Sequence, residues 1–173
     1  MSEPIAILSA KRTPIGAMLG ELSSISSIEL GATAIAAAVE SAGLTPSLID
    51  ELIMGCVLSA GLGQAPTRQA ALGAGLDVHT ACTTVNKVCG SGMNAVTSAC
   101  NALQAQQAKL IVAGGMESMS QAPHLLPKAR MGYRFGERRV LDHMQFDGLQ
   151  DAFHGQSMGQ FAELCAAKYN FSR

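Results

Sequence analysis

Two continuous apolar runs constrain the fold of this chain more than any other feature of its sequence. Leu52–Leu58 reads LIMGCVL, and Leu110–Ala113 reads LIVA and is closed by Gly114 and Gly115. A strand with one face in water alternates polar and apolar residues, whereas a continuous apolar run is typical of a strand covered on both faces. We therefore predict a sheet between two layers. The shorter run Ile5–Leu8 is predicted to be a first buried strand.

Helix and strand patterns alternate along the first two thirds of the chain. Ser26 and Glu29 have the spacing of a capping box, which begins a helix, and Gly43 is a typical helix end. The alternation predicts an α/β layered fold with a largely parallel sheet. The other predicted elements are a short helix over 66–72, a strand within 81–88, a helix over about 89–107 and an amphipathic helix over 158–169.

The character of the chain changes after Gly115. The stretch 116–150 contains Pro123 and Pro127 and holds five of the twelve Lys and Arg residues. We interpret it as a long excursion or the start of a second subdomain. The predicted division is one domain over 1–117 and the beginning of another over 118–173. The five basic residues are Lys128, Arg130, Arg134, Arg138 and Arg139.

Composition argues against several classes of protein. Only 14% of the residues are charged and the net charge is −1, so neither nucleic-acid binding nor disorder is expected. No apolar stretch of about 18 residues exists, and therefore no membrane span is predicted. The five cysteines contain no C-x-x-C pair and no signal peptide precedes them. We expect a protein of a reducing compartment, here the cytoplasm, with free thiols and no zinc site.

Cys89 stands directly before Gly90-Ser91-Gly92, and three interpretations of it compete. The thiol could be packed in a core, because free cysteine often behaves as a small hydrophobe. The glycines could form a dinucleotide-binding turn, since 90–95 fits G-x-G-x-x-A, although such a turn normally belongs to a first strand–helix unit. Cys89 could also be a nucleophile at the head of a helix. The cysteines for which we predict simple packing are Cys56, Cys82, Cys100 and Cys165.

The predicted helix after Cys89 favours the nucleophile. Unpaired N–H groups and the positive end of the helix dipole both stabilise a thiolate relative to a thiol. The backbone N–H groups of Cys89 and Gly90 could also receive the oxyanion that forms on an attached acyl group. The helix is small or apolar on nearly every side, which is typical of a buried helix. We therefore expect Cys89 deep in the domain, at the end of a narrow tunnel.

The segment 86–93, NKVCGSGM, resembles the nucleophile motif of the thiolases, the acetyl-CoA C-acyltransferases. Further segments also resemble thiolase sequence, occur in the family's order and together cover essentially the whole chain. KRTPIG at 11–16 resembles the family's opening strand and turn, and GQAPTRQA at 63–70 resembles its dimer contact. GGMESMS at 114–120 resembles the end of its fourth strand. DGLQDAF at 147–153 and SMG at 157–159 resemble its substrate loop.

The resemblance implies a fold and a reaction. The fold would be a thiolase-like layered αβα structure, the N-terminal half with a mostly parallel mixed sheet, plus part of a loop domain. Cys89 would take an acyl group from acyl-CoA as a thioester. A second acetyl-CoA, deprotonated at its methyl group, would attack that thioester and give acetoacetyl-CoA and CoA, or the reverse thiolysis would run, in fatty acid metabolism. Coenzyme A thioesters would be substrates, with no separate cofactor and no metal.

The resemblance also implies binding residues and an assembly. Leu149, Ser157 and Met158 would line the pantetheine and acyl channel, although many biosynthetic thiolases have histidine where this chain has Ser157. His154 is predicted to be an ordinary loop residue. A homo-oligomer, dimer or tetramer, is expected, because the basic cluster at 128–139 falls where thiolases place a tetramer-forming loop. Contact with CoA phosphates and a solvated loop are the alternatives for that cluster.

The resemblance covers only the N-terminal half of a thiolase and the first part of its loop domain. The family's activating histidine and second cysteine would belong to a missing C-terminal half, so we expect little turnover from these 173 residues alone. Two other classes of function stay open at this point: a condensing enzyme of the ketoacyl-synthase type, and a non-catalytic assembly module derived from a thiolase half. Acyl-chain length and physiological direction are also open, with short chains as the family-based expectation.

Overall fold

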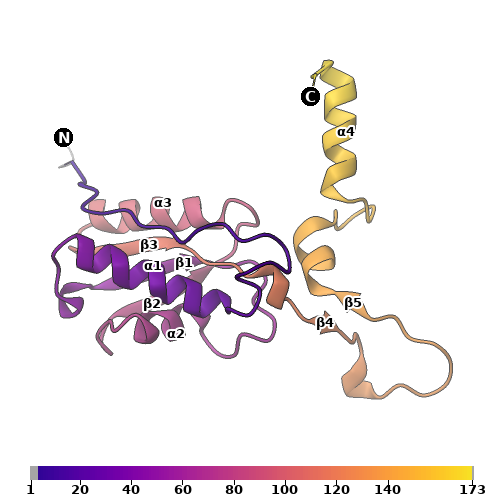
Figure 1. Cartoon of the computed structure of the whole chain (residues 1–173), viewed down its shortest axis with the longest axis horizontal. Helices are drawn as coiled ribbons and strands as arrows, with labels where there is room; N and C mark the ends of the chain where they lie inside the picture. Colours follow the sequence, from indigo (N-terminus) through magenta and orange to yellow (C-terminus); the bar gives the residue numbers. More distant parts are fainter. Residues whose placement is uncertain (1–3, 173) are drawn as a thin grey trace. The chain divides into compact units, whose positions relative to one another are not determined.

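The computed structural model describes residues 4–172, which form two compact units divided between Gln121 and Ala122 (Figure 1). The first unit is built around a three-stranded parallel sheet. β1 (Glu51–Gly55) lies between β2 (Ala81–Val85) and β3 (Ile111–Gly115). Their register places the carboxyl ends of all three strands at the same edge of the sheet. The mostly parallel sheet is therefore confirmed.

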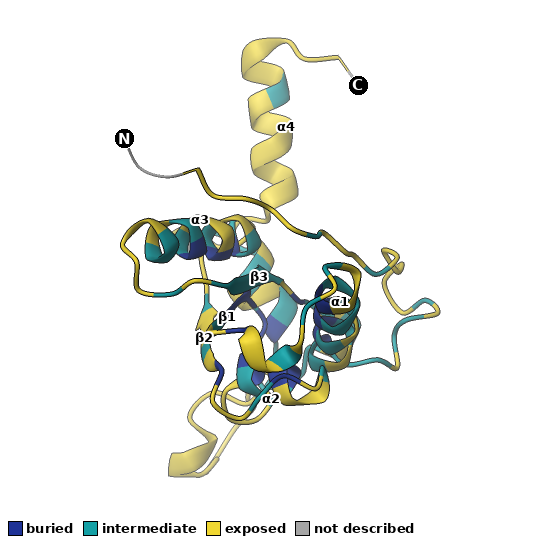
Figure 2. Cartoon of the chain, turned by 90° about the vertical axis from the view of Figure 1, so that its left-hand side faces the viewer, coloured by how far each residue is buried: buried dark blue, intermediate teal, exposed yellow. Residues whose placement is uncertain are grey.

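Helices cover both faces of this sheet, which confirms the predicted layers. α1 (Ser27–Ser41) and α2 (Pro66–Gly73) lie on one face, and α3 (Ser91–Gln104) lies on the other (Figure 2). Side chains of the central strand β1 alternate between the two cores: Leu52 packs in the cluster of α1 and α2, and Ile53 in the cluster of α3. The central position explains the continuous apolar run, because neither face of β1 meets water.

Local signals determine the helix ends as predicted. The Ser26 hydroxyl accepts a hydrogen bond from the Glu29 N–H at 3.2 Å, and the Glu29 carboxylate accepts one from the Ser26 N–H at 2.9 Å. This capping box satisfies two donors that the first turn of α1 would otherwise leave unpaired. Gly43 follows the helix with φ 68°, a left-handed conformation that glycine adopts without strain. Pro66 begins α2, as expected.

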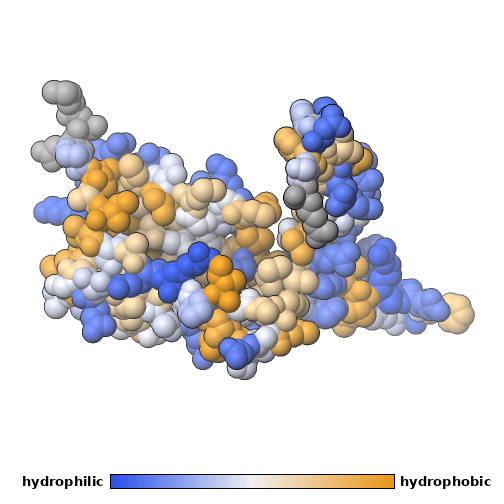
Figure 3. Space-filling view, turned by 45° about the horizontal axis from the view of Figure 1, so that its top comes forward, coloured by the Kyte–Doolittle hydropathy of each residue, from blue (hydrophilic) through white to orange (hydrophobic). Residues whose placement is uncertain are grey.

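The predicted first strand at Ile5–Leu8 is wrong. The segment forms no strand, and the side chains of Ile7 and Leu8 are 85% and 58% exposed. Apolar composition suggested burial, but a strand also has to pair with a neighbour, and this segment pairs with neither edge strand of the sheet. Among the described residues, β1, β2 and β3 pair only with one another. Apolar side chains consequently appear on the surface of this unit, as Figure 3 shows.

The second unit contains a short antiparallel ribbon and a long helix. β4 (His124–Leu125) pairs with β5 (Leu141–Asp142), and a π-helical turn over Met144–Leu149 follows. The predicted helix over 158–169 is confirmed as α4 (Met158–Tyr169). Short 3₁₀ turns occupy Pro46–Leu48, Met119–Gln121 and Ala129–Met131.

The described helices do not provide a membrane span, since none combines sufficient length with sufficient apolarity.

The closest backbone approach in the first unit joins α3 to the carboxyl end of β1. A Cβ at Gly55 would lie 2.5 Å from the carbonyl carbon of Ser91 and 2.6 Å from the nitrogen of Gly92. On the neighbouring strand, a Cβ at Gly115 would lie 3.4 Å from the Gly92 Cα. Only glycine permits such an approach at Gly55. The start of α3 therefore rests on the strand ends, and the residues just before α3 are held at the carboxyl edge of the sheet.

Replacing Gly55 with alanine should destabilise the protein and displace the start of α3. The new Cβ would overlap backbone atoms, which cannot move aside as a flexible side chain can. We expect a loss of about 1–3 kcal/mol in the free energy of unfolding, the usual range for overpacking, measured by urea denaturation. Gly114→Ala is the matched control, because its Cβ would meet only the Met54 side chain, at 3.5 Å from Sδ and 3.8 Å from Cε. Equal unfolding midpoints for the two variants would contradict this account.

Candidate active site at the head of helix α3

A tight turn over 86–91 joins β2 to α3 and carries Cys89. The Asn86 side-chain oxygen accepts a hydrogen bond from the Val88 N–H at 2.9 Å, and the Gly90 N–H donates to the Lys87 carbonyl at 3.1 Å. Val88 has φ 48°, a left-handed conformation that is unusual for a β-branched residue and costs about 1–2 kcal/mol. Backbone strain of this kind is stored where a turn must present one side chain in a fixed direction.

Ser91 fastens this turn, a role that the sequence analysis missed. Its hydroxyl accepts a hydrogen bond from the Lys87 N–H at 2.8 Å and donates one to the Val88 carbonyl at 2.6 Å. The side chain is buried, with 4% of the residue exposed. A serine at the first position of a helix, between two glycines that leave no other side chain nearby, was the available signal. Ser91 holds both residues that precede Cys89, so the thiol has a defined position.

The thiol of Cys89 is exposed and free. The expectation of a deep position at the end of a tunnel is therefore wrong for this chain. The reason lies in α3, which buries one stripe against the sheet and leaves Met93 73% exposed and Val96 51% exposed. The residues of α3 are small or apolar on nearly every side, so the sequence did not show which face of the helix would be covered.

Cys89 and the residues that follow it at the start of α3 carry backbone N–H groups, only some of which have an acceptor. The Gly90 N–H that we predicted as an oxyanion donor is already bonded to Lys87. Among the hydrogen bonds of residues 4–172, none uses the N–H of Cys89 or of Gly92 as donor. These groups are the orphan donors that every helix start leaves. The N–H groups of Cys89 and Gly92 therefore remain free to bind an anion.

Cys56, which directly follows β1, differs from Cys89 because it is buried. The pKa of its thiol is raised to about 12, chiefly by burial and in smaller part by the neighbouring Glu117 carboxylate, which repels the thiolate charge and accepts the thiol's hydrogen bond. Packing was the prediction for Cys56 and is confirmed. Cys82 and Cys100 are partly buried. Cys165 is exposed on α4, so packing is wrong there, because α4 buries no residue.

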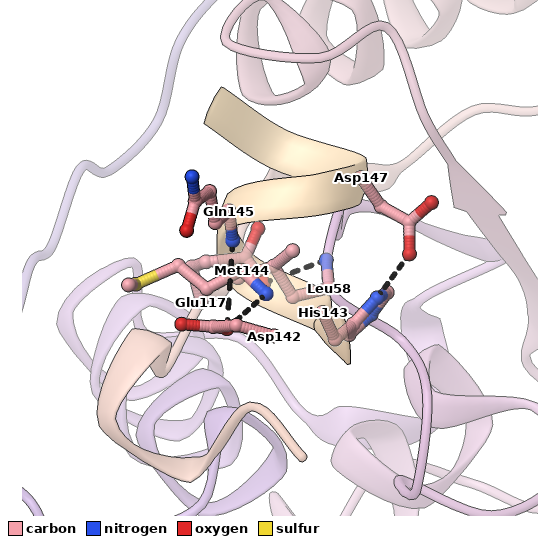
Figure 4. Close-up of polar contacts among 7 residues, drawn as sticks. All are labelled: Leu58, Glu117, Asp142, His143, Met144, Gln145 and Asp147. Carbon is pink, nitrogen blue, oxygen red and sulfur yellow. Dashed lines mark hydrogen bonds and ion pairs between the residues drawn. The ribbon is translucent and has the colours of Figure 1, made fainter. Parts of the chain in front are cut away.

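Glu117 holds the loop after β1, which the sequence analysis also missed. Its two carboxylate oxygens accept hydrogen bonds from the N–H groups of Val57 at 2.8 Å and Leu58 at 3.0 Å, the second of which is drawn in Figure 4. A glutamate two residues after the glycines that close a strand was the signal. The carboxylate is committed to the backbone, so it offers no partner for a ribose, and the dinucleotide interpretation of 90–95 loses its acidic residue.

The predicted substrate-lining residues belong to the second unit. Leu149 ends the π-helical turn and is 36% exposed, and Met158 begins α4 and is 44% exposed. Ser157 is the N-cap of α4, where its hydroxyl accepts a hydrogen bond from the Gln160 N–H at 3.4 Å. An isolated antiparallel bridge between Gln150 and Ser157 brings the ends of this loop together. The structure thus gathers all three residues around one bridge.

Other polar groups of the second unit have simpler positions. His154 is exposed in a turn, where its N–H donates to the Asp151 carboxylate at 2.6 Å, as expected of a loop residue. A cavity of about 440 Å³ in this unit has basic walls contributed by Lys128, Arg138 and Arg139. Within residues 4–172, no three His, Cys, Asp or Glu side chains are grouped as a metal site would require.

Known proteins similar to this chain agree on one family. A family model described as the thiolase N-terminal domain matches residues 5–173. The chain is 54% identical over 168 residues to the acetyl-CoA acetyltransferase of Escherichia coli (strain K12), covering 96% of this chain and 43% of the relative. It is 51% identical over 169 residues to acetyl-CoA acetyltransferase 2 of Arabidopsis thaliana, covering 98% and 42%.

A solved structure gives the same result at the level of the fold. The crystal structure of Acat5 thiolase from Ascaris suum in complex with coenzyme A matches with a TM-score of 0.91 and 39% identity, over 95% of this chain and 43% of that chain. The chain thus spans about two fifths of the length of these relatives. The family model matches almost the whole of this chain, and the structure has the layered sheet and a cysteine at the head of α3. This chain therefore belongs to the thiolase family.

Proposed function

We propose that the protein containing this chain is an acetyl-CoA C-acetyltransferase in which Cys89 is the nucleophile. The observation that carries this proposal is the strained turn that presents an exposed Cys89 thiol beside unpaired N–H groups at the start of α3. The relatives named as acetyl-CoA acetyltransferases support the choice of acetyl-CoA. The same names favour a thiolase over a ketoacyl-synthase-type enzyme or an assembly module.

The reaction proceeds in two steps through a thioester. In the first, the Cys89 thiolate attacks the carbonyl of acyl-CoA, the carbon–sulfur bond to CoA breaks, and CoA leaves as a thiol after taking up a proton. In the second, a general base of the full-length protein takes a proton from the methyl of acetyl-CoA, the resulting carbanion attacks the acetyl group on Cys89, and the thiolate of Cys89 is released with acetoacetyl-CoA. Thiolysis is the reverse. The N–H groups of Cys89 and Gly92 stabilise the oxyanion in each step.

Leu149, Ser157 and Met158 are proposed to contact the CoA thioester. Leu149 and Met158 contribute apolar surface for the pantetheine and acyl group, since both are partly exposed. The Ser157 hydroxyl is engaged in the cap of α4, so Ser157 contributes its small volume rather than a hydrogen bond. The structural neighbour described as a complex with coenzyme A supports this ligand class. No cofactor is needed beyond the CoA thioesters.

The loop at 126–140 is proposed to build a homo-oligomer. Met131 and Phe135 are 83% and 95% exposed there, so both offer apolar surface that a partner could cover. The division at 117/118 is proposed to separate the thiolase domain from this loop domain. A cytoplasmic location accords with the five free thiols.

The nucleophile assignment predicts a covalent adduct. After incubation of the full-length protein with acetyl-CoA, mass spectrometry of proteolytic peptides should find an acetyl group on Cys89. Cys89→Ser should lower kcat on the order of 10⁴-fold or more, as removal of a nucleophile does in other enzymes. Cys100→Ser is the control, because this thiol is partly buried within α3. An acetylated protein that carries no label on Cys89 would refute the assignment.

The buried position of Cys56 and the exposed position of Cys89 predict different reactivities for the two thiols. At pH 8, a thiol with a pKa of about 12 is ionised in only roughly one molecule in 10⁴. Iodoacetamide should therefore modify exposed Cys89 and leave Cys56 unmodified until the pH approaches 12 or the protein unfolds. In Glu117→Gln the loss of the negative charge should lower the pKa of Cys56, but burial, the larger cause, should keep it well above 9. Comparable alkylation of Cys56 and Cys89 at pH 8 would contradict this prediction.

If the loop at 126–140 builds a homo-oligomer, substitutions of its exposed apolar residues should change the mass of the oligomer. Phe135→Asp and Met131→Asp should reduce the oligomer to a smaller species in size-exclusion chromatography with light scattering, because a charge would be buried in the contact. Arg139→Gln in the wall of the basic cavity should leave the mass unchanged. If Phe135→Asp keeps the native mass while Arg139→Gln raises KM for acetyl-CoA, the loop contacts CoA phosphates instead.

A further inference from the structure

The π-helical turn over Met144–Leu149 is a rare conformation that ends at a proposed substrate-lining residue. π-helical turns contain one more residue in each hydrogen-bonded ring than α-helical turns, and they occur mostly as single turns at functional sites. The direction of the residue at the end of such a turn therefore depends on the side-chain ties that hold the turn in place.

Two acidic side chains provide such ties, and they act at different places. The Asp142 carboxylate accepts a hydrogen bond from the Met144 N–H at 2.8 Å, which fixes the start of the turn. The imidazole Nδ1 of His143 lies 2.5 Å from Oδ2 of Asp147, across the body of the turn (Figure 4). A carboxylate only accepts, so Nδ1 carries the proton. The His143 side chain is 8% exposed and that of Asp147 is 42% exposed.

The anchor of this pair is the buried histidine. The His143 N–H donates to the Pro123 carbonyl at 3.1 Å, and the preceding residue, Asp142, pairs with His124 in the β4–β5 ribbon. His143 therefore belongs to the fixed side of the turn, and Asp147 belongs to the side that leads to Leu149. The contact between them spans the residues whose spacing decides where Leu149 points.

The far end of the turn is tied to the other two proposed lining residues. Gln150 returns to extended backbone with φ −113° and ψ 137°, and it bridges to Ser157. Asp151 N–H donates to the Gln156 carbonyl at 2.8 Å beside that bridge. A change of spacing within the turn would therefore move Leu149 relative to a bridge that holds Ser157 and Met158.

We propose that His143 and Asp147 are positioning residues that set the orientation of Leu149 in the acyl-CoA channel. Without the contact between His143 and Asp147, the part of the turn that leads to Leu149 would lose the side-chain tie to its anchored start, and the direction of Leu149 would no longer be fixed. Neither side chain takes part in bond making or breaking. Their loss lowers substrate affinity and leaves the chemical step at Cys89 intact. This inference rests on the proposed function, because it concerns the same substrate channel.

The test compares variants of Asp147 in the full-length protein by the kinetics of acetoacetyl-CoA thiolysis. Asp147→Ala is expected to raise KM for acetoacetyl-CoA about tenfold, the size of effect that follows loss of one charge-assisted hydrogen bond, with kcat within about twofold of the wild type. Asp147→Asn is expected to restore KM to within about threefold, because its amide oxygen still accepts from Nδ1. His154→Ala, which removes an exposed ring from another His–Asp pair, is expected to change neither constant.

A double-mutant cycle with Leu149→Ala identifies the route of the effect. If the pair acts through Leu149, Asp147→Ala should add little to KM once Leu149 is truncated. Additive effects of the two substitutions would overturn the inference, as would an Asp147→Ala variant with wild-type KM or one with a reduced kcat and an unchanged KM. Should Asp147→Ala fail to fold, the same comparison is made on His143. The amide nitrogen of His143→Asn can replace Nδ1, so this variant should keep KM near the wild-type value. The amide of His143→Gln lies farther out, so this variant should raise KM, and equal KM values for the two would overturn the inference.

Calorimetric titration with coenzyme A separates this inference from the proposed function. A wild-type protein that binds CoA without turning over acetoacetyl-CoA would refute the proposed activity, and the Kd of CoA for the Asp147 variants would still test the positioning pair. Weaker CoA binding by Asp147→Ala, restored in Asp147→Asn, supports the pair. A wild-type protein that does not bind CoA overturns both.

Discussion

The approach of α3 to the end of β1 is the constraint on which the first unit depends. At Gly55 the space beyond the Cα is occupied by the backbone of Ser91 and Gly92, so the helix start sits directly on the central strand. Parallel strands present their carboxyl ends at one edge, the position where ligands bind in many open α/β sheets. The turn over 86–91 joins β2 to this fixed helix start. It contains the left-handed backbone of Val88 and is held by the hydrogen bonds of Ser91.

Two cysteines come after adjacent strands at this edge, and their environments make them chemically different. Cys56 comes directly after β1, where burial and the Glu117 carboxylate keep its thiol protonated. Cys89 comes after β2, where the thiol is exposed and lies beside unpaired N–H groups. The residue after the central strand is buried, whereas the turn after the edge strand reaches the surface. Strand position in the sheet therefore separates a packing thiol from a proposed nucleophile.

The second unit depends on short-range ties rather than on a core. Its long helix buries no residue, and its organised region is the segment from β5 to the start of α4. There the Asp142 cap, the contact between His143 and Asp147, and the bridge between Gln150 and Ser157 succeed one another along the chain. Such a series transmits a change at one residue to the next, which is why the orientation of Leu149 can depend on a histidine six residues earlier.

The sequence by itself determined the features whose causes are local or that carry a family's motif. The capping residues Ser26 and Glu29 defined the start of α1, the run at 52–58 indicated a central strand, and NKVCGSGM indicated the thiolase family and its nucleophile. Each of these signals lies within a few residues of the feature that it predicts.

Only the tertiary structure decided which surfaces are covered. Ile5–Leu8 and Cys165 looked suited to burial but are exposed, and α3 buries one stripe although it is apolar on most sides. The left-handed backbone of Val88 and the pairing of His143 with Asp147 were equally invisible in the sequence. The physical reason is the same throughout: hydrophobicity states what a side chain favours, whereas burial and strain depend on which other segments the fold brings against it.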